Sequence, residues 1–270
     1  MRIRLIILLC MVAVTSFSQK NIFPHSGTLI IIGGGSMPDT LYQAFAKLIG
    51  GKDQPVVYIP TATGDEEWIQ QGKHLDKFIQ QGFTQLKTLH TRDRKKAESP
   101  ELAAMINSAR GVFLGGGDQE KLAEAYGGTA VHRALIALLN RGGVIMGTSA
   151  GATIMGSVLI GGDHRKTPHI PTQFAEGFSL MQSTAIDQHV LVRNRQFDLV
   201  PVLERLPGVF GMALDESTAA IVRQDSITVI GKSYMLVYDP TDWAKQQKEW
   251  GRVYRPFWMI AAGKSYQLTR

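Results

Sequence analysis

The sequence predicts a three-layer α/β fold, in which helices cover both faces of a mostly parallel sheet. Short apolar runs rich in β-branched residues, such as residues 28–32, are continuous rather than alternating, which is typical of strands buried on both faces. These runs alternate with segments of helical spacing as far as about residue 155. An apolar fraction of 44% over 270 residues is enough for a large core.

The elements follow one another in a regular order. The expected strands are residues 28–32, 55–60, 85–89, 111–114 and 143–147. The expected helices are residues 40–49, 65–81, 100–109, 120–125 and 131–140, with a further helix beginning at residues 152–155. A hairpin is expected over 219–222 and 226–230, before a final helical or looped segment that carries Trp243, Trp250 and Trp258. The alternation implies βαβ units, whose strands bring their C-terminal loops to one edge of the sheet.

The first 18 residues have a different character from the rest of the chain. Arg2 and Arg4 precede an uncharged run over residues 5–17, and the segment Ser16-Phe17-Ser18 offers small serines for a cleavage site before Gln19. This run is shorter than the roughly 20 apolar residues of a membrane-spanning helix. We therefore expect a signal peptide at 1–18 and a single α/β hydrolytic domain at 19–270, exported to the periplasm or beyond the cell, without stable membrane insertion after cleavage.

Charge and cysteine content exclude several classes of function. Cys10 is the one cysteine of the sequence, so its removal with the leader would exclude disulfides, a thiol nucleophile and cysteine metal ligands. The net charge of +6 is mild, and the one dense basic run, residues 92–96, is interrupted by Asp93. This run is typical of a solvated face rather than of a basic stripe, so no nucleic-acid partner is expected.

A candidate nucleophile lies in the run Gly-Thr-Ser-Ala-Gly at residues 147–151. A nucleophile elbow needs glycines around its serine because the strand turns sharply into a helix there. Ser149 would then be exposed at the turn, and the N–H of Ala150, at the helix start, is placed to hold an oxyanion. The same run also fits a plain strand-to-helix turn capped by Ser or Thr.

A second glycine-rich loop, residues 115–119, ends another expected strand and should reach the same edge of the sheet. Gly116 or Gly117 would supply a second oxyanion N–H there, and Gln119 would face substrate or solvent. Asp118 is suited to cap the helix that follows, which is compatible with an oxyanion role for the glycines.

His189 is the best candidate for the base that a serine nucleophile requires. Arg193 and Arg195 follow two residues apart, so on an extended segment they would present two guanidinium groups on one side, suited to a carboxylate. Salt bridges to Asp187, Asp198 or Glu204 are the alternative role for these arginines.

Five ordered segments carry a resemblance to a known family: residues 32–35, 113–119, 147–152, 187–195 and 214–219. Together they resemble the cyanophycinases and aspartyl dipeptidases of peptidase family S51, serine hydrolases on a fold related to class I glutamine amidotransferases. The resemblance implies that Ser149 is the nucleophile and His189 the general base. It also implies that Gln119, Gln188, Arg193 and Arg195 line a pocket for an aspartyl group of a peptide or cyanophycin-like substrate.

The family places the acid of the triad a short way after the serine, where Asp163 stands in this chain, so Asp163 is the expected third member. Glu216 and Asp187 are the competitors. No metal or organic cofactor is implied, and a homodimer is common in the family. Asp198 stands where cyanophycin-cleaving members often have a basic residue, so isoaspartyl or acidic dipeptides are open as substrates beside cyanophycin.

Two other functions fit parts of the sequence. His164 and His169 lie near Asp163, which is compatible with a metal-assisted amidohydrolase, although the stretch better fits a mobile active-site loop. A non-catalytic binding protein on an amidotransferase-like fold is the other alternative. Inhibition by a chelator would indicate the metal-assisted enzyme. Failure of a serine-directed acylating reagent to label Ser149 would indicate the non-catalytic binding protein.

Overall fold

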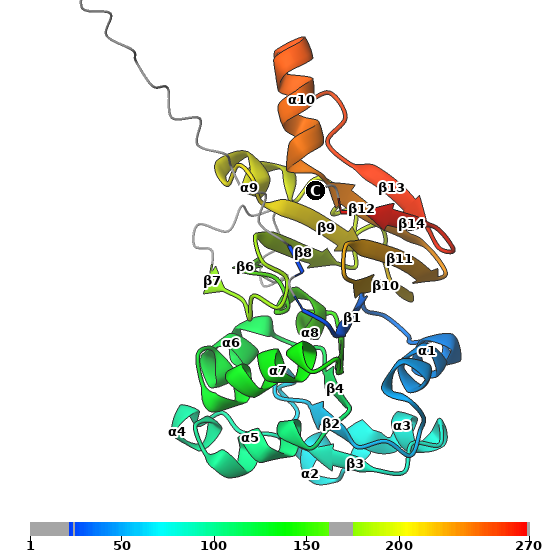
Figure 1. Cartoon of the computed structure of the whole chain (residues 1–270), viewed down its shortest axis with the longest axis vertical. Helices are drawn as coiled ribbons and strands as arrows, with labels where there is room; N and C mark the ends of the chain where they lie inside the picture. The colour runs from blue at the N-terminus through cyan, green and yellow to red at the C-terminus, as the bar shows by residue number, and fades with distance from the viewer. Residues whose placement is uncertain (1–21, 24, 162–174, 269–270) are drawn as a thin grey trace, which may run out of the picture.

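The structure is a computed structural model that describes residues 22–23, 25–161 and 175–268. The expected signal peptide and Asp163 lie outside the described residues. Figure 1 shows the helices α2 to α7 and the strands β2 to β4 at one end of the molecule and a second sheet with α9 and α10 at the other end.

The first sheet has eight strands in the order β14-β11-β10-β1-β5-β4-β2-β3, and β1, β5, β4, β2 and β3 pair in parallel. Its strands are β1 (Thr28–Ile32), β2 (Val56–Ile59), β3 (Leu86–Thr88), β4 (Gly111–Leu114), β5 (Val144–Thr148), β10 (Thr218–Arg223), β11 (Ser226–Gly231) and β14 (Ser265–Gln267). The expected hairpin is present as the antiparallel pair β10 and β11. The predicted α/β class with a mostly parallel sheet is confirmed.

Helices cover both faces of this sheet. One apolar cluster packs the helix α1 (Asp39–Ile49) and Phe78 of α3 against Ile30, Ile32 and Tyr58. The opposite cluster packs helices against Leu29 and Ile31: α5 (Pro100–Asn107), α6 (Gln119–Tyr126) and α7 (Ala130–Asn140). The strands β1 and β2 are buried at every residue because both of their faces are covered.

The second sheet has six strands in the order β13-β12-β9-β8-β6-β7. Its strands are β6 (Val158–Leu159), β7 (Ala175–Glu176), β8 (Thr184–Gln188), β9 (Phe210–Leu214), β12 (Tyr234–Tyr238) and β13 (Trp258–Ala261). The strands β8 and β9 are parallel, with Gln188 opposite Leu214. This register brings the residues after both strands to one edge, beside the residues that follow β1.

One expectation about the elements needs correction, and one part of the fold was not anticipated. Residues 65–81 form α2 (Glu66–Gln70), η1 (Lys73–Leu75) and α3 (Asp76–Gln80) instead of one helix, because the chain turns at Gly72 with a φ of 72°. The second sheet was not anticipated. The basic run does lie on a solvated face, as expected: it ends in the short helix α4 (Arg94–Ala97), whose Arg94, Lys95 and Lys96 are exposed.

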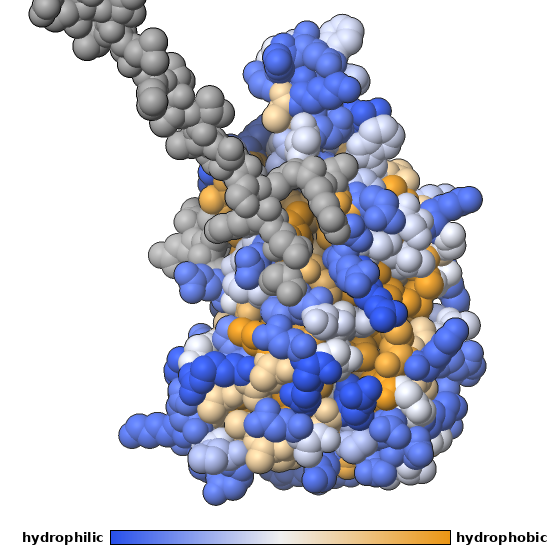
Figure 2. Space-filling view, in the orientation of Figure 1, coloured by the Kyte–Doolittle hydropathy of each residue, from blue (hydrophilic) through white to orange (hydrophobic). Residues whose placement is uncertain are grey.

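The helix α9 (Val200–Arg205) lies on the second sheet, and α10 (Pro240–Trp250) projects from the end of the molecule. Figure 2 shows α10 covered mainly by hydrophilic residues, and Gln246 is its buried residue. No helix in the described ranges is both long and apolar enough to cross a membrane.

Candidate active site

Ser149 occupies a strained turn between β5 and the short helix α8 (Ala150–Thr153). Its φ of 53° and ψ of −116° lie outside the helical and extended regions, and its N–H donates to the carbonyl of Ile32 at 3.0 Å. A Cβ at Gly147 would lie 2.3 Å from the carbonyl oxygen of Gly151, and one at Gly151 would lie 2.2 Å from that of Leu114. The turn therefore requires glycine at both positions.

His189 follows β8 and meets this serine. Its Nε2 lies 3.1 Å from Ser149 Oγ, a hydrogen-bonding distance. The residue has a φ of 54°, and its N–H donates to the carbonyl of Gly33 at 2.8 Å. The imidazole is held by strained backbone and by the loop after β1, as expected for a site that fixes its geometry before a ligand binds.

Glu216 follows β9 and is the third member of a row of contacting side chains formed by Ser149, His189 and Glu216. Its Oε1 lies 2.5 Å from His189 Nδ1. Ser217 has a φ of 55°, and its N–H donates to the carbonyl of Gly34 at 2.9 Å. The carboxylate that contacts His189 in the described residues is thus that of Glu216, the competitor, whereas the expected Asp163 lies outside them.

The glycines after β1 form the surface against which these residues pack. A Cβ at Gly33 would lie 2.2 Å from the carbonyl oxygen of Asp215, and one at Gly35 would lie 2.6 Å from Glu216 Oε2. A Cβ at Gly34 would enter the ring of His189, 2.3 Å from Cε1. The sequence indicated a tight turn here, and the close approach of three loops is the reason for the glycines.

Burial lowers the pKa of His189 below its ordinary value. The hydrogen bond that His189 donates to Glu216 raises the pKa, and the positive charges of Arg193 and Arg195 lower it further. The imidazole is therefore neutral at neutral pH and able to accept a proton at Nε2.

Two backbone amides lie beside Ser149. A Cβ at Gly116 would lie 3.4 Å from Ser149 Cβ, so this loop passes directly beside the serine. In the described part of the chain the N–H groups of Gly116 and Ala150 donate to no carbonyl. Gly117 lies against the segment after β2, where its Cβ would be 2.2 Å from the carbonyl oxygen of Ala62. The N–H of Gly117 likewise donates to no carbonyl in the described residues, so Gly116 and Gly117 both stay candidates beside Ala150 for the oxyanion donors.

The two glutamines expected in the pocket are buried. Gln188 Oε1 lies 3.5 Å from Ser149 Oγ, at the limit of a hydrogen bond. Gln119 donates from Nε2 to the carbonyl of Ile160 at 2.7 Å, so its amide connects the loop after β4 to the chain after β6. The side chain of Gln188 therefore lies next to the serine, whereas the side-chain amide of Gln119 is bonded to the backbone of Ile160.

The two arginines do not share one side of an extended segment. Residues 191–199 form consecutive turns, and Asn194 has a φ of 54°. Arg195 is buried and contacts Asp187 Oδ1 at 2.7 Å and Asp198 Oδ2 at 3.2 Å. Arg193 is exposed. The expectation of an extended segment was wrong, because the chain turns back on itself immediately after His189.

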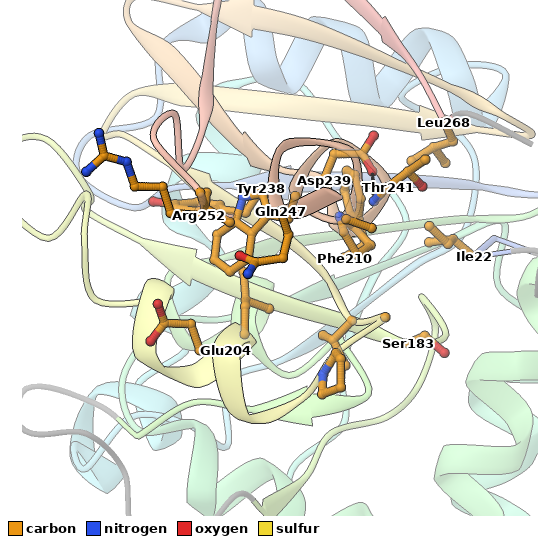
Figure 3. A pocket seen from close by; sticks show the side chains of 18 of the residues that line it. Ile22, Ser183, Glu204, Phe210, Tyr238, Asp239, Thr241, Gln247, Arg252 and Leu268 are labelled. Carbon is orange, nitrogen blue, oxygen red and sulfur yellow. Dashed lines mark hydrogen bonds between the residues drawn. The ribbon is translucent and has the colours of Figure 1, made fainter. Parts of the chain in front are cut away.

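The site is separate from a large cavity at the other end of the second sheet (Figure 3). This cavity has a volume of about 1140 Å³ and lies between α9, α10 and the end of β12, lined by residues such as Phe210, Tyr238 and Trp243. None of its lining residues belongs to the row Ser149, His189 and Glu216. The stretch with His164 and His169 lies outside the described residues, among which no cluster of three or more metal-ligating side chains was found.

Comparison with known proteins identifies the family. The model of Peptidase family S51 matches residues 29–230. The chain belongs to this family. Relatives of this S51 chain include the cyanophycinase of Trichormus variabilis, 31% identical over 80% of this chain and 74% of that protein, and the cyanophycinase of Synechococcus elongatus, 29% identical over 81% and 70%. Family membership makes the chain a serine-type peptidase.

Solved structures share the S51 fold. A peptidase from an acI-B1 Actinobacterium superposes with a TM-score of 0.70 over 90% of this chain and 97% of that chain, at 22% identity. A putative peptidase E from Listeria monocytogenes gives a TM-score of 0.55 over 77% and 99%, at 15% identity. At these identities the likeness concerns the fold.

Sequence reasoning missed two features of the site. The glycines after β1 were not connected with His189, although a run of three glycines after a buried strand is a signal of close backbone approach. Asp215 was also not considered, yet its carboxylate accepts N–H groups from the turn after His189. The signal available in the sequence for Asp215 was its position directly before Glu216, a candidate acid of the triad.

Proposed function

We propose that this chain is an exported serine peptidase of the cyanophycinase type, which hydrolyses peptide or isopeptide bonds next to aspartyl residues through an acyl-enzyme. The observation that carries the proposal is the continuous contact from Ser149 Oγ to His189 Nε2 and from His189 Nδ1 to Glu216 Oε1. This order of nucleophile, imidazole and carboxylate is that of a serine hydrolase triad.

Acylation begins when Ser149 Oγ attacks the carbonyl carbon of the scissile bond and passes its proton to His189 Nε2. Glu216 holds the imidazole with its proton on Nδ1 and stabilises the positive charge that forms. His189 then gives the proton to the leaving nitrogen, the carbon–nitrogen bond breaks, and the acyl group stays on Ser149. The lowered pKa of His189 keeps the ring neutral before the attack and, once the ring is protonated, favours transfer of the proton to the leaving nitrogen.

The tetrahedral oxyanion would be held by the N–H groups of Gly116 and Ala150. Both amides border Ser149, and Ala150 begins α8. Fixed N–H donors of this kind are worth about 3 kcal/mol each to the transition state. Deacylation repeats the sequence with water, whose proton His189 accepts, and releases the acid.

Arg193 is the group that would bind the free carboxylate of the aspartyl residue. It is exposed, and its charge acts on His189, so it lies near enough to the site to influence a bound anion. Arg195 is already paired with Asp187 and Asp198 and would hold the turn instead. Both α- and β-linked aspartate leave one carboxylate free for Arg193.

Substrate class is tested with a panel of α- and β-aspartyl dipeptides, neutral dipeptides of the same size, and cyanophycin. The mature protein should cleave the aspartyl dipeptides, and Arg193→Ala should reduce their kcat/KM while leaving the rate for neutral dipeptides unchanged. Equal relative rates for acidic and neutral dipeptides in both proteins would overturn the aspartyl specificity. A chelator in parallel reactions should have no effect, which separates this mechanism from metal-assisted hydrolysis.

Export is proposed from the leader at residues 1–18. Expression of the full chain should yield a mature protein whose amino terminus is Gln19, found in the periplasm or medium. Amino-terminal sequencing of the purified protein checks this, and a protein that keeps Met1 in the cell would contradict it.

A further inference from the structure

Asp215 lies between the end of β9 and Glu216, and its side chain reaches the turn that follows His189. Its Oδ1 accepts the N–H of Leu191 at 3.1 Å and that of Val192 at 3.0 Å. These two amides are the second and third after His189. One carboxylate oxygen therefore fixes the start of the turn on which the imidazole is carried.

The other oxygen of Asp215 fixes a third segment. Oδ2 accepts the hydroxyl of Ser233 at 2.7 Å, in the chain just before β12. The N–H of Asp215 donates to the carbonyl of Tyr234 at 3.2 Å. The N–H of Ser233 donates in turn to Thr218 Oγ1 at 2.9 Å, beyond Glu216. The side chain of Asp215 is consequently held on both sides and has a defined orientation.

The arrangement joins the two loops whose relative position sets the contact between His189 and Glu216. His189 has a left-handed backbone, so its orientation depends on bonds outside its own strand. Asp215 supplies two of those bonds from the residue next to Glu216. A shift of the His189 turn is therefore resisted by the same backbone that carries the carboxylate.

We infer that Asp215 is a positioning residue of the triad, which links the turn after His189 to the loop of Glu216 and so keeps Nδ1 on the carboxylate. The inference rests on the proposed function, since it assigns Asp215 a role through the Ser149, His189 and Glu216 relay. Asp215 itself touches none of these three side chains in the described contacts.

The test measures the rate at which a small uncharged phosphonylating reagent labels Ser149, because this reaction needs the base but no substrate pocket. The proteins are the mature wild type, Asp215→Ala, Asp215→Asn and Asp93→Ala. Asparagine keeps a carbonyl oxygen for the two N–H groups and an amide that can donate to Ser233 Oγ. Asp93 accepts the N–H of Lys95 at 2.8 Å beside α4, far from β8 and β9 (Figure 1). Asp93→Ala is therefore a control that removes a similar carboxylate-to-backbone bond away from the site.

Asp215→Ala should slow labelling by on the order of ten- to a hundredfold, since a misplacement of about 1 Å costs that much. Asp215→Asn should stay within about threefold of wild type, and Asp93→Ala should be unchanged. With the aspartyl substrate, kcat of Asp215→Ala should fall while KM stays constant. Equal labelling of wild type and Asp215→Ala would overturn the inference, as would loss in Asp215→Asn equal to that in Asp215→Ala. Absence of labelling in wild type would instead overturn the proposed triad.

Discussion

The backbone of Gly34 lies against the imidazole of His189, so close that a Cβ on Gly34 would be 2.3 Å from Cε1 and 2.4 Å from Nε2. The loop after β1 thus forms one wall of the His189 site, and it also receives the N–H of His189 and of Ser217. The orientation of the base depends on a residue that has no side chain. This relationship makes the first strand part of the catalytic apparatus proposed here.

Gly34→Ala should therefore abolish most of the activity. The methyl group displaces the ring from Ser149 Oγ, and loss of a well-oriented base costs about a hundredfold or more in kcat. The matched control is Gly142→Ala, because Gly142 has a φ of +85° but nothing within 4 Å of an added Cβ. Both variants carry the strain of a positive φ, about 1 kcal/mol. Kinetic assays together with denaturant unfolding should show similar stability losses but a loss of kcat in Gly34→Ala alone.

Glu216→Gln tests which acid serves the triad. The amide keeps the size of the side chain but loses the negative charge that stabilises protonated His189, so kcat should fall by about 10²- to 10⁴-fold. Asp163→Asn should leave kcat within about threefold of wild type, because Glu216 already occupies the Nδ1 side of the ring. A larger loss of kcat in Asp163→Asn than in Glu216→Gln would show that Asp163 is the acid of the triad.

The pH dependence of Ser149 labelling reports the pKa of His189 in the free protein. Burial lowers this pKa below the ordinary value of 6.5, and the reactive form is the neutral one, so labelling should fall only as pH drops below 6.5. Arg193→Gln removes a positive charge that lowers the pKa, so the acid limb should move to higher pH. An uncharged reagent keeps the charge of the substrate out of the measurement. A limb that moves to lower pH in Arg193→Gln would contradict this reading of the site.

Arg193 and Arg195 should behave differently on removal. Arg195→Ala leaves the carboxylate of Asp187, itself 1% exposed, without its buried cation, which typically costs about 3–5 kcal/mol of unfolding free energy. Arg193→Ala removes a side chain at an exposed position, where an ion pair is worth at most about 1 kcal/mol, so the unfolding free energy should change by no more than that. Urea denaturation measures both values, and equal stability of the two variants would show that Arg195 is not structural.

The first sheet was predictable because its parallel strands are buried on both faces. Residues 28–32 and 111–114 are continuous apolar runs, and their expected bounds coincide with β1 and β4. The second sheet escaped prediction for physical reasons. The strand β8 buries Asp187 and Gln188, and the Asp187 carboxylate is tolerated inside because Arg195 and the N–H of Gln188 bond to it. The strands β6 and β7 are too short to produce any periodic pattern.

The same distinction applies to the site. The turn at Ser149 is encoded locally, by glycines on both sides, and could be located from a few neighbouring residues. The contact between His189 and Glu216 joins residues 27 apart, and it depends on the parallel pairing of β8 with β9. His189 is the first residue after β8 and Glu216 the second after β9, so recognition of the second sheet would have favoured Glu216. The turns after His189, and hence the divergence of Arg193 from Arg195, left no comparable pattern in the sequence.

The most direct test of the central claim is hydrolysis of a β-aspartyl dipeptide by the mature protein and by Ser149→Ala, with release of free aspartate as the measured product. The wild type should turn the substrate over, and the variant should lose at least about 10³-fold in kcat while its unfolding midpoint stays close to that of wild type. Hydrolysis by Ser149→Ala at the wild-type rate would contradict the account, because no other described nucleophile contacts His189.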